Sequence, residues 1–322
     1  MSREQTPALT DGGGEPVSVA VTGAGGRMGR EVIELASDRT GFEVTLAVNR
    51  STVADVAGVP VRTVEGGEDL AEGLSETDPD VLVDFTAPTA AVAYAEACVA
   101  ADVPIVTGTT GFSDADREAL DRASESVPVL VASNFSRGIL ALRRAVREAV
   151  EALPGYDVEL TETHHNGKRD APSGTAKTIL DDVEAIVDDG TDAPGRVHGR
   201  EGDQPRTAGE IGVHARRAGD VTGEHELLLA GNRETLSVSH RAGDRGVFAA
   251  GALDAAAWLA DRKTGRYEFA DVVDDQPDRG SSGRAAEERN VDRSEDRTEN
   301  HSRSDEPTTD EPTTDEQIGD DT

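Results

Sequence analysis

Short apolar runs alternate with longer helical stretches over the first part of the chain. Val17–Val21, Phe42–Val48 and Val81–Phe85 are mainly apolar and are expected to be strands. Strands that alternate with helices predict an α/β fold with a doubly wound parallel sheet, in which ligands bind at the carboxyl ends of the strands. Two further strands are expected at Pro104–Thr107 and Val129–Ala132, and helices at Val32–Ala36, Ala90–Ala101 and Asp114–Ser126.

The pattern changes after Asn134–Gly138. A helix is expected over Ile139–Leu153, followed by a strand at Val158–Thr163. Three later runs with Gly-rich turns are expected to be antiparallel strands. We therefore predict a second, α+β domain with a mixed or antiparallel sheet, and a closing helix over Val247–Trp258 that returns to the first domain. The expected later strands are Ile211–Ala215, Glu224–Leu229 and Glu234–His240, and the expected domains are 16–136 with 246–274, and 137–245.

The two ends of the chain have a different composition. Residues 1–15 are polar and glycine-rich without an apolar stretch, and residues 275–322 are acidic with almost no apolar residues. Such segments cannot bury enough apolar surface to fold, so both are expected to be disordered tails. No run of eighteen apolar residues occurs, and the protein is expected to be soluble and cytoplasmic.

The formal net charge is -32, from 64 acidic and 32 basic residues. This charge repels nucleic acid and anionic membranes, so neither is expected as a partner. Acidic residues are spread through the whole chain and lysine is scarce, which favours adaptation to high salt; an acidic mesophilic protein is the alternative. The single cysteine, Cys98, cannot form an intrachain disulfide and is expected in the core of a protein from a reducing compartment.

A glycine cluster, Gly23–Gly29, lies between the first expected strand and the first expected helix. This is the context of a Rossmann-like dinucleotide loop, where glycines let the backbone approach a pyrophosphate at a helix N-terminus. The strict Gly-x-Gly-x-x-Gly spacing would put a glycine at Met28, so a generic tight turn is the alternative. Arg50, after the second strand, favours the 2′-phosphate of NADP; a solvated strand end is the alternative.

A second cluster, Glu162–Ala176, contains two histidines, a lysine and a helix start. Lysine can have its pKa lowered and can release a proton, which arginine effectively cannot. Ser173 or its neighbour is expected to cap a helix whose free N–H groups attract a carboxylate or phosphate. The cluster predicts an anion site; an ordinary strand, polar loop and capped helix are the alternative.

Four segments in one order, Gly23–Gly29, Thr107–Gly111, Ala132–Ser136 and His164–Ala176, resemble the dihydrodipicolinate reductase (4-hydroxy-tetrahydrodipicolinate reductase) family. The resemblance covers the chain from about Val17 to about Val273. Its most specific part is His-His-x-x-Lys-x-Asp-x-Pro-Ser-Gly-Thr. The resemblance implies NAD(P)H-dependent reduction of dihydrodipicolinate, or 4-hydroxy-tetrahydrodipicolinate, to tetrahydrodipicolinate in lysine (diaminopimelate) biosynthesis.

The resemblance also implies roles for individual residues. His164 and Lys168 would be catalytic, and no metal is expected. The substrate, a cyclic dicarboxylate, would contact His165, Ser173, Gly174 and Thr175. The cofactor would contact Gly23, Ala24, Gly25, Gly26, Arg27, Met28, Arg50, Gly108, Thr109, Thr110, Ala132, Ser133, Asn134 and Phe135.

Some of these implications depend on details of this chain. The family usually has an acidic residue where Asn49 stands, so NADPH is favoured as cofactor and NADH remains possible. His164 and His165 would point to opposite faces of a strand unless the chain bends, and Asn166–Gly167 is a turn-prone pair that allows a bend. The family implies a homotetramer that pairs through the second sheet. The alternatives are an amino-acid dehydrogenase, such as aspartate dehydrogenase, and a non-catalytic nicotinamide-binding sensor. Core or interface roles are expected for His214, His225 and His240.

Overall fold

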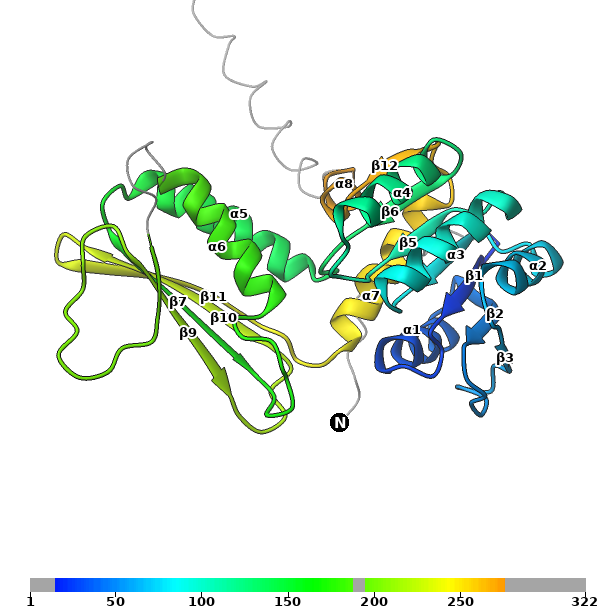
Figure 1. The fold of residues 1–322 in the computed structure, drawn as a ribbon, viewed down its shortest axis with the longest axis horizontal. Coiled ribbons are helices and arrows are strands. Elements are labelled where there is room, and N and C mark those ends of the chain that lie inside the picture. The colour runs from blue at the N-terminus through cyan, green and yellow to red at the C-terminus, as the bar shows by residue number, and fades with distance from the viewer. Residues whose placement is uncertain (1–14, 188–194, 276–322) are drawn as a thin grey trace, which may run out of the picture. The chain divides into compact units, whose positions relative to one another are not determined.

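The structure is a computed structural model that describes residues 15–187 and 195–275 (Figure 1). The two tails expected to be disordered lie outside the described residues, apart from Glu15 and Asp275. Within the described ranges, every helix is too short or too polar to cross a membrane.

A seven-stranded sheet forms the first part of the fold, in the order β12-β6-β5-β4-β1-β2-β3. Each strand pair in it is parallel, which confirms the expected doubly wound α/β architecture. The chain places β2 and β3 on one side of β1 and then β4, β5 and β6 on the other side. The carboxyl ends of β1 and β4 therefore lie at the point where ligands bind in such sheets. The strands are β1 (Val17–Thr22), β2 (Phe42–Asn49), β3 (Val61–Thr63), β4 (Val81–Asp84), β5 (Ile105–Thr107), β6 (Pro128–Val131) and β12 (Gly265–Tyr267).

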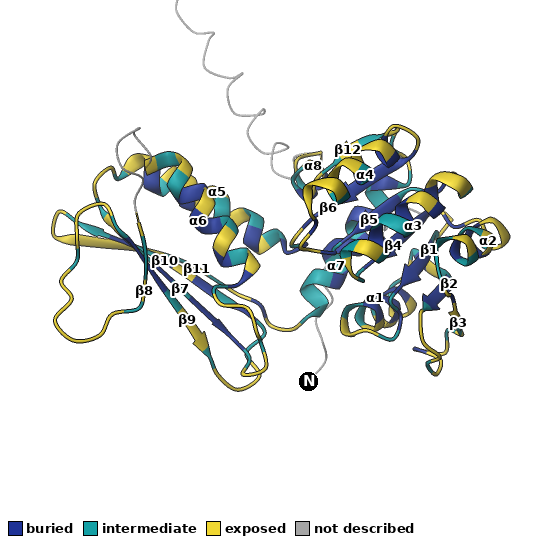
Figure 2. Ribbon diagram, viewed as in Figure 1, coloured by how far each residue is buried: buried dark blue, intermediate teal, exposed yellow. Residues whose placement is uncertain are grey.

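Helices cover both faces of this sheet, which explains why its strands are continuous apolar runs (Figure 2). One face packs against α1 (Arg27–Asp38), α7 (Gly246–Leu259) and α8 (Phe269–Asp274). The other packs against α2 (Gly67–Thr77), α3 (Pro88–Ala101) and α4 (Asp114–Ser124). Helix α7 therefore returns to the core of the first sheet, as expected, and Cys98 of α3 is a fully buried core residue.

Five elements were not expected from the sequence: β3, α2, β8 (Arg196–His198), β12 and α8. The three strands have three residues each, too few for a period to be recognised. Helix α2 buries only Leu70, Gly73 and Leu74, so its apolar stripe is weak. These are peripheral elements, and tertiary packing rather than local pattern defines them.

The second sheet has the order β11-β10-β7-β9-β8 and is mixed. Strand β10 is antiparallel to β7 and β11, as expected, whereas β9 is parallel to β7, so the antiparallel expectation for Ile211–Ala215 was wrong. The reason is that the chain returns to the same end of the sheet twice, through α6 before β8 and through residues 199–210 before β9, so β8 and β9 both run parallel to β7. The remaining bounds are β7 (Asp157–His164), β9 (Ile211–Arg217), β10 (Glu224–Gly231), β11 (Glu234–Arg241), α5 (Arg137–Ala152) and α6 (Gly174–Val187).

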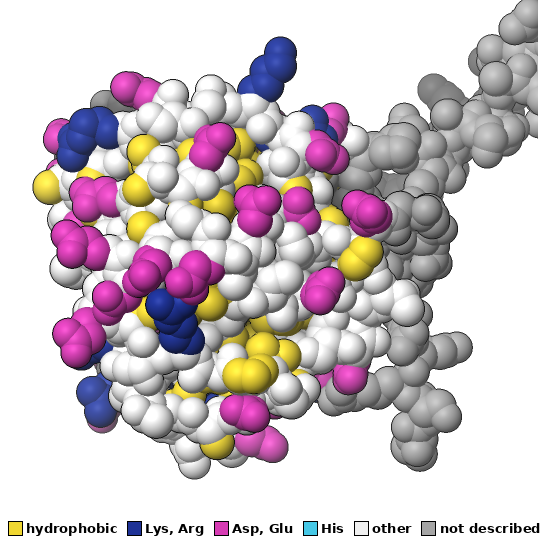
Figure 3. Space-filling view, turned by 90° about the vertical axis from the view of Figure 1, so that its right-hand side faces the viewer, with side chains coloured by type: hydrophobic (Ala, Val, Ile, Leu, Met, Phe, Trp, Pro, Cys, Tyr) yellow, Lys and Arg dark blue, Asp and Glu magenta, His cyan; other side chains and the backbone are white. Residues whose placement is uncertain are grey.

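Helices α5 and α6 lie on one face of the second sheet and form a separate apolar core with it. Leu160, Leu227 and Val213 point into this core from three neighbouring strands. Figure 3 shows one face of the molecule on which acidic side chains are widespread and basic ones are few. The charge excess of the sequence is therefore carried on the folded surface as well.

Candidate active site

The glycine loop after β1 makes a close turn into α1. Gly23 has φ of +67°, and its carbonyl accepts the Gly26 N–H at 2.8 Å. A Cβ on Gly29 would lie 2.2 Å from the Gly23 carbonyl oxygen, closer than real Cβ contacts allow. Gly29 thus supplies the close helix–loop approach that the third glycine of the strict motif provides. The glycines at positions 23, 26 and 29, which are spaced by three, therefore fit a dinucleotide loop.

Asn49 ties the end of β2 to the same loop. Its side-chain oxygen accepts the Gly25 N–H at 3.2 Å, and its amide donates to the Ser51 carbonyl at 2.7 Å. The next residue, Arg50, is exposed, and within 15–187 and 195–275 its guanidinium has no hydrogen bond or ion pair. Arg50 is therefore placed at the strand end expected for ribose recognition, with its donors unused.

Asp84, the last residue of β4, is fully buried and accepts four hydroxyl hydrogen bonds. The Thr22 and Thr107 hydroxyls donate at 2.7 Å each, Thr86 at 2.6 Å and Thr109 at 2.9 Å. These threonines stand at or just after the carboxyl ends of β1, β4 and β5. The carboxylate therefore joins the glycine loop to the segment Gly108–Thr110, both expected at the cofactor.

The segment Ala132–Phe135 follows β6 and only partly faces solvent. The Ala132 N–H donates to the Thr107 carbonyl at 3.1 Å, which aligns the segment with the previous one. The Phe135 ring is 1 % exposed and packs edge-on between Phe85 and Phe269. Its side chain is a core residue, so only the backbone of Phe135 is placed to meet a ligand.

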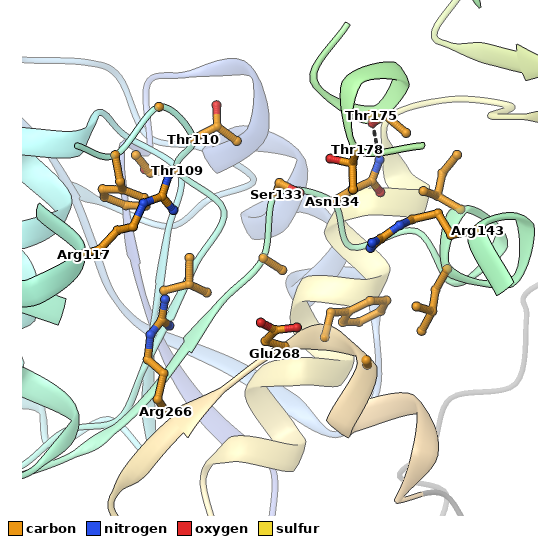
Figure 4. A pocket seen from close by; sticks show the side chains of 18 residues that line it. Thr109, Thr110, Arg117, Ser133, Asn134, Arg143, Thr175, Thr178, Arg266 and Glu268 are labelled. Atoms are coloured by element: carbon orange, nitrogen blue, oxygen red, sulfur yellow. Dashed lines mark hydrogen bonds between the residues drawn. The ribbon is translucent and has the colours of Figure 1, made fainter. Parts of the chain in front are cut away.

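One hydrogen bond joins the cofactor and substrate candidates. The Asn134 amide donates to the Thr175 hydroxyl at 3.0 Å, and its oxygen accepts the Ser136 N–H at 2.7 Å. A cavity of about 410 Å³ lies at this contact (Figure 4). Of the expected ligand contacts it brings together Thr109, Thr110, Ala132, Ser133, Asn134 and Thr175, and its lining also includes Arg117, Arg143 and Arg266. The glycine loop, Arg50, His164 and Lys168 are outside its lining.

At the end of β7, His164 belongs to a buried charged network. Its Nδ1 lies 2.6 Å from Glu162 Oε2, and Glu162 is fully buried. Arg217 of β9 donates two hydrogen bonds to the Glu162 oxygens at 2.8 Å each, and the Ser173 N–H donates at 3.0 Å. Burial raises the pKa of Glu162, but the hydrogen bonds from His164 and Arg217 outweigh it and lower the pKa to about 2.

The chain leaves the strand at His164 and turns, which confirms the expected bend at Asn166–Gly167. The Lys168 N–H donates to the His165 carbonyl at 3.1 Å across this turn, and Lys168 Nζ lies 2.9 Å from Asp170 Oδ1. Desolvation, followed by the charges of Arg245 and Arg27, lowers the pKa of His165. Arg27 is the first residue of α1, so the glycine loop is close enough to act on His165 electrostatically.

Ser173 caps α6, as expected: its hydroxyl accepts the Ala176 N–H at 3.1 Å. The same hydroxyl lies 3.1 Å from Nε2 of His225, and Ser173 is 2 % exposed. Its side chain and N–H are thus committed inside the protein, whereas Gly174 is exposed and Thr175 half-buried. Burial, followed by the charge of His164, lowers the pKa of His225 to about 4. The surface of the helix start is therefore formed by Gly174 and Thr175 rather than by Ser173.

Sequence reasoning gave Asp84, Glu162 and Arg217 no role. A signal was present for Glu162, because residues two apart on a strand point to one face, which places it beside His164. Arg217 lies 55 residues from Glu162, and only the parallel pairing of β7 with β9 brings the two together. His214 and His240 were also expected in core or interface roles. His214 contacts the Glu159 carboxylate, and His240 contacts the Ser136 hydroxyl.

Comparison with known proteins agrees with this architecture. Residues 17–135 match the family model described as dihydrodipicolinate reductase, N-terminus, and residues 138–273 match the one described as dihydrodipicolinate reductase, C-terminus. The 4-hydroxy-tetrahydrodipicolinate reductase of Natronomonas pharaonis is 55 % identical over 258 residues, which is 80 % of this chain and 100 % of the relative. That of Haloarcula marismortui is 56 % identical over 256 residues, or 80 % of this chain and 98 % of the relative.

Among solved structures, a dipicolinate-bound dihydrodipicolinate reductase from Paenisporosarcina sp. TG-14 has the same fold. Its TM-score is 0.61 at 22 % identity, over 79 % of this chain and 97 % of that one. Both family models are matched in order, and together they extend from the first strand to the last described helix. The chain belongs to the dihydrodipicolinate reductase family.

Proposed function

We propose that this protein reduces 4-hydroxy-tetrahydrodipicolinate, or its dehydrated form dihydrodipicolinate, to tetrahydrodipicolinate with NAD(P)H, a step of lysine (diaminopimelate) biosynthesis. The observation that carries the proposal is the combination of His164, Lys168 and the exposed start of α6 on a chain that matches both family models. The highly similar relatives bear the name of this activity.

The first sheet offers a fitting site for a nicotinamide dinucleotide. The space beside Gly29 is closed to any side chain, and the N–H groups at the start of α1 suit a pyrophosphate. Arg50, which has no hydrogen bond or ion pair with the part of the chain that the structure describes, suits a 2′-phosphate. Asn49 carries no charge to repel that phosphate, so we propose NADPH as the preferred cofactor over NADH. When bound, the cofactor supplies the hydride.

The substrate is a dianion, and the second site offers positive charge and N–H donors. The Gly174 and Thr175 amides at the start of α6 would hold one carboxylate, and His165 with Lys168 would hold the other. Thr175 is hydrogen-bonded to Asn134, so this carboxylate site adjoins the segment that would line the nicotinamide.

Hydride addition to the conjugated C=C/C=N system leaves negative charge that must be protonated. His164 and Lys168 are the candidate proton donors, because both carry exchangeable protons on the segment that leads from β7 to the start of α6. General acid catalysis of this kind contributes about 10²- to 10⁴-fold to the rate.

The proposal extends to organisation and assembly. Residues 16–136 with 246–274 would form the cofactor domain and residues 137–245 the substrate domain. The face of the second sheet away from α5 and α6 would pair subunits in a homotetramer, and the acidic surface would suit a salt-rich cytoplasm.

The test uses the purified full chain in molar KCl. NADPH oxidation is expected only with the fresh condensation product of aspartate semialdehyde and pyruvate, and Lys168→Ala should lose most turnover while NADPH binding survives. Oxidation with aspartate or another amino acid instead would indicate an amino-acid dehydrogenase. NADPH binding without turnover of any substrate would indicate a sensor, and either result contradicts the proposal.

A further inference from the structure

We propose that Glu162, held by Arg217, is a positioning residue that leaves Nε2 of His164 as its proton-exchanging atom, and that Gly223 keeps this atom accessible. The inference rests on the proposed function, because it assigns how one of the two candidate proton donors is oriented. It adds three residues that the family resemblance did not assign.

The first step concerns which nitrogen of His164 carries a fixed proton. Glu162 accepts hydrogen bonds from Arg217 and from the Ser173 N–H, and its third contact is Nδ1 of His164 at 2.6 Å. With the pKa of Glu162 lowered to about 2, the carboxylate has no proton of its own at neutral pH and acts only as an acceptor. Nδ1 must therefore carry the hydrogen, and Nε2 is left to gain or lose the catalytic proton.

The second step concerns charge. Arg217 faces the same carboxylate with two hydrogen bonds, so its positive charge balances the negative charge of Glu162. The third charged or titratable neighbour, His225 of β10, packs edge-on against the His164 ring with centroids 5.3 Å apart and has a lowered pKa. Lys168 lies in the turn after β7 and pairs with Asp170 at 2.9 Å. The pair Glu162–Arg217 thus fixes the orientation of His164 without leaving a net charge beside its ring.

The third step concerns access to Nε2. A Cβ placed on Gly223, the residue before β10, would lie 3.1 Å from Nε2 and 3.5 Å from Cδ2 of His164. Any side chain at position 223 would therefore cover the nitrogen from which the proton leaves. The limited space beside His164, and not the backbone conformation, requires a glycine at position 223, because Gly223 does not have a positive φ.

The same strand contains a matched control. Glu159 of β7 lies 2.7 Å from Nε2 of His214 and pairs with Arg206, so it forms the same kind of carboxylate, imidazole and guanidinium group. Because 159 and 162 differ by an odd number, the two glutamates point to opposite faces of the sheet. Among the described residues, the side-chain partners of Glu159 are Arg200, Arg206 and His214, and none of them belongs to the proposed site.

The kinetic test compares Glu162→Gln, Glu162→Asp, Gly223→Ala and Glu159→Gln. We expect kcat to fall about 10²-fold in Glu162→Gln, the low end of the general-acid contribution, with the basic limb of the pH profile moved to lower pH. Glu162→Asp should partly restore both, Gly223→Ala should lower kcat with unchanged NADPH affinity, and Glu159→Gln should match wild type. Equal kcat and equal pH profiles in Glu162→Gln and Glu159→Gln would overturn the proposal.

A second measurement needs no variant and covers the case in which Glu162→Gln does not fold. A neutron crystal structure of the full wild-type chain at neutral pH is expected to show hydrogen at Nδ1 of His164. Hydrogen at Nε2 alone would overturn the orientation. If the wild type does not turn over the dicarboxylate at all, the proposed function fails, and the neutron structure still decides the orientation of His164 independently.

Discussion

Gly29→Ala tests whether the glycine loop is built for close helix approach. The added Cβ would lie 2.2 Å from the Gly23 carbonyl oxygen, 2.7 Å from its carbonyl carbon and 3.0 Å from Ala24 Cα. Because all three atoms belong to the backbone, a side-chain rotation cannot relieve the contact. The loop or the start of α1 must move by about 1 Å to restore a normal separation.

Two opposing effects set the size of the change in stability. Alanine is favoured over glycine in a helix interior by about 1 kcal/mol, whereas forcing a methyl group into a closed space costs about 1–3 kcal/mol. The steric cost equals or exceeds the gain in helix propensity, so the free energy of unfolding should fall by 0 to about 2 kcal/mol. Cofactor affinity should change more, because displacement of the loop weakens two hydrogen bonds to a charged phosphate, worth about 1.5 kcal/mol each, or roughly 100-fold in Kd.

The assay is NADPH titration and urea unfolding in molar KCl, with Gly73→Ala as control. A Cβ on Gly73, in α2, would meet only side-chain atoms, the closest being Leu46 Cδ2 at 3.3 Å. The control should therefore keep its NADPH affinity and lose little or no stability. If Gly29→Ala bound NADPH as tightly as Gly73→Ala, the close approach would have no role in the cofactor site.

Three further predictions follow from buried polar groups. Asp84→Asn should lower the free energy of unfolding by about 3 kcal/mol, because two of the four charged hydrogen bonds to this side chain lose their acceptor. The control Asp80→Asn, at an exposed aspartate that accepts from Ser18, should lower it by under about 1 kcal/mol. Equal losses of the two variants in urea unfolding would refute this prediction. His225 has a pKa lowered from 6.5 to about 4, so its contribution to stability, on the order of 3 kcal/mol, is complete above pH 6.5 and is lost as the pH falls towards 4. The free energy of unfolding of His225→Gln, measured at pH 7 and at pH 4.5, should therefore depend less on pH than that of the wild type. An unchanged pH dependence would contradict this prediction. Cys98 is 0 % exposed and burial raises the pKa of its thiol, so a thiol reagent should label it only after denaturant is added, and rapid labelling of native protein would contradict its core position.

The sequence predicted those features that depend on neighbouring residues. The alternation of apolar runs with helical stretches indicated the doubly wound parallel sheet, and the turn at Asn166–Gly167 and the cap at Ser173 follow from the chemistry of two or three residues. Gly29 shows the limit of a motif. The strict spacing expects the third glycine of the loop at position 28, where Met28 stands, whereas in the structure Gly29 makes the close approach.

Features that depend on non-neighbouring elements were not predictable in this way. The direction of β9 is set by the return of the chain between β8 and β9 and not by its own residues. Asp84 meets the hydroxyls of Thr22, Thr107 and Thr109 only because β4 lies between β1 and β5. Phe135 was assigned to the cofactor from its segment, yet its ring packs into the core. A segment resemblance locates the backbone, whereas the direction of each side chain depends on packing.

The proposed reaction is hydride transfer from the cofactor to a dicarboxylate held by His165, Lys168 and the start of α6. Its most direct test is the reaction of the full chain in molar KCl with NADPH deuterated at the transferred position of the nicotinamide C4, followed by mass spectrometry of the tetrahydrodipicolinate formed. We expect one deuterium in each product molecule, and greatly reduced product with Lys168→Ala. NADPH consumption without deuterium in the product, or equal labelled product from Lys168→Ala, would contradict it.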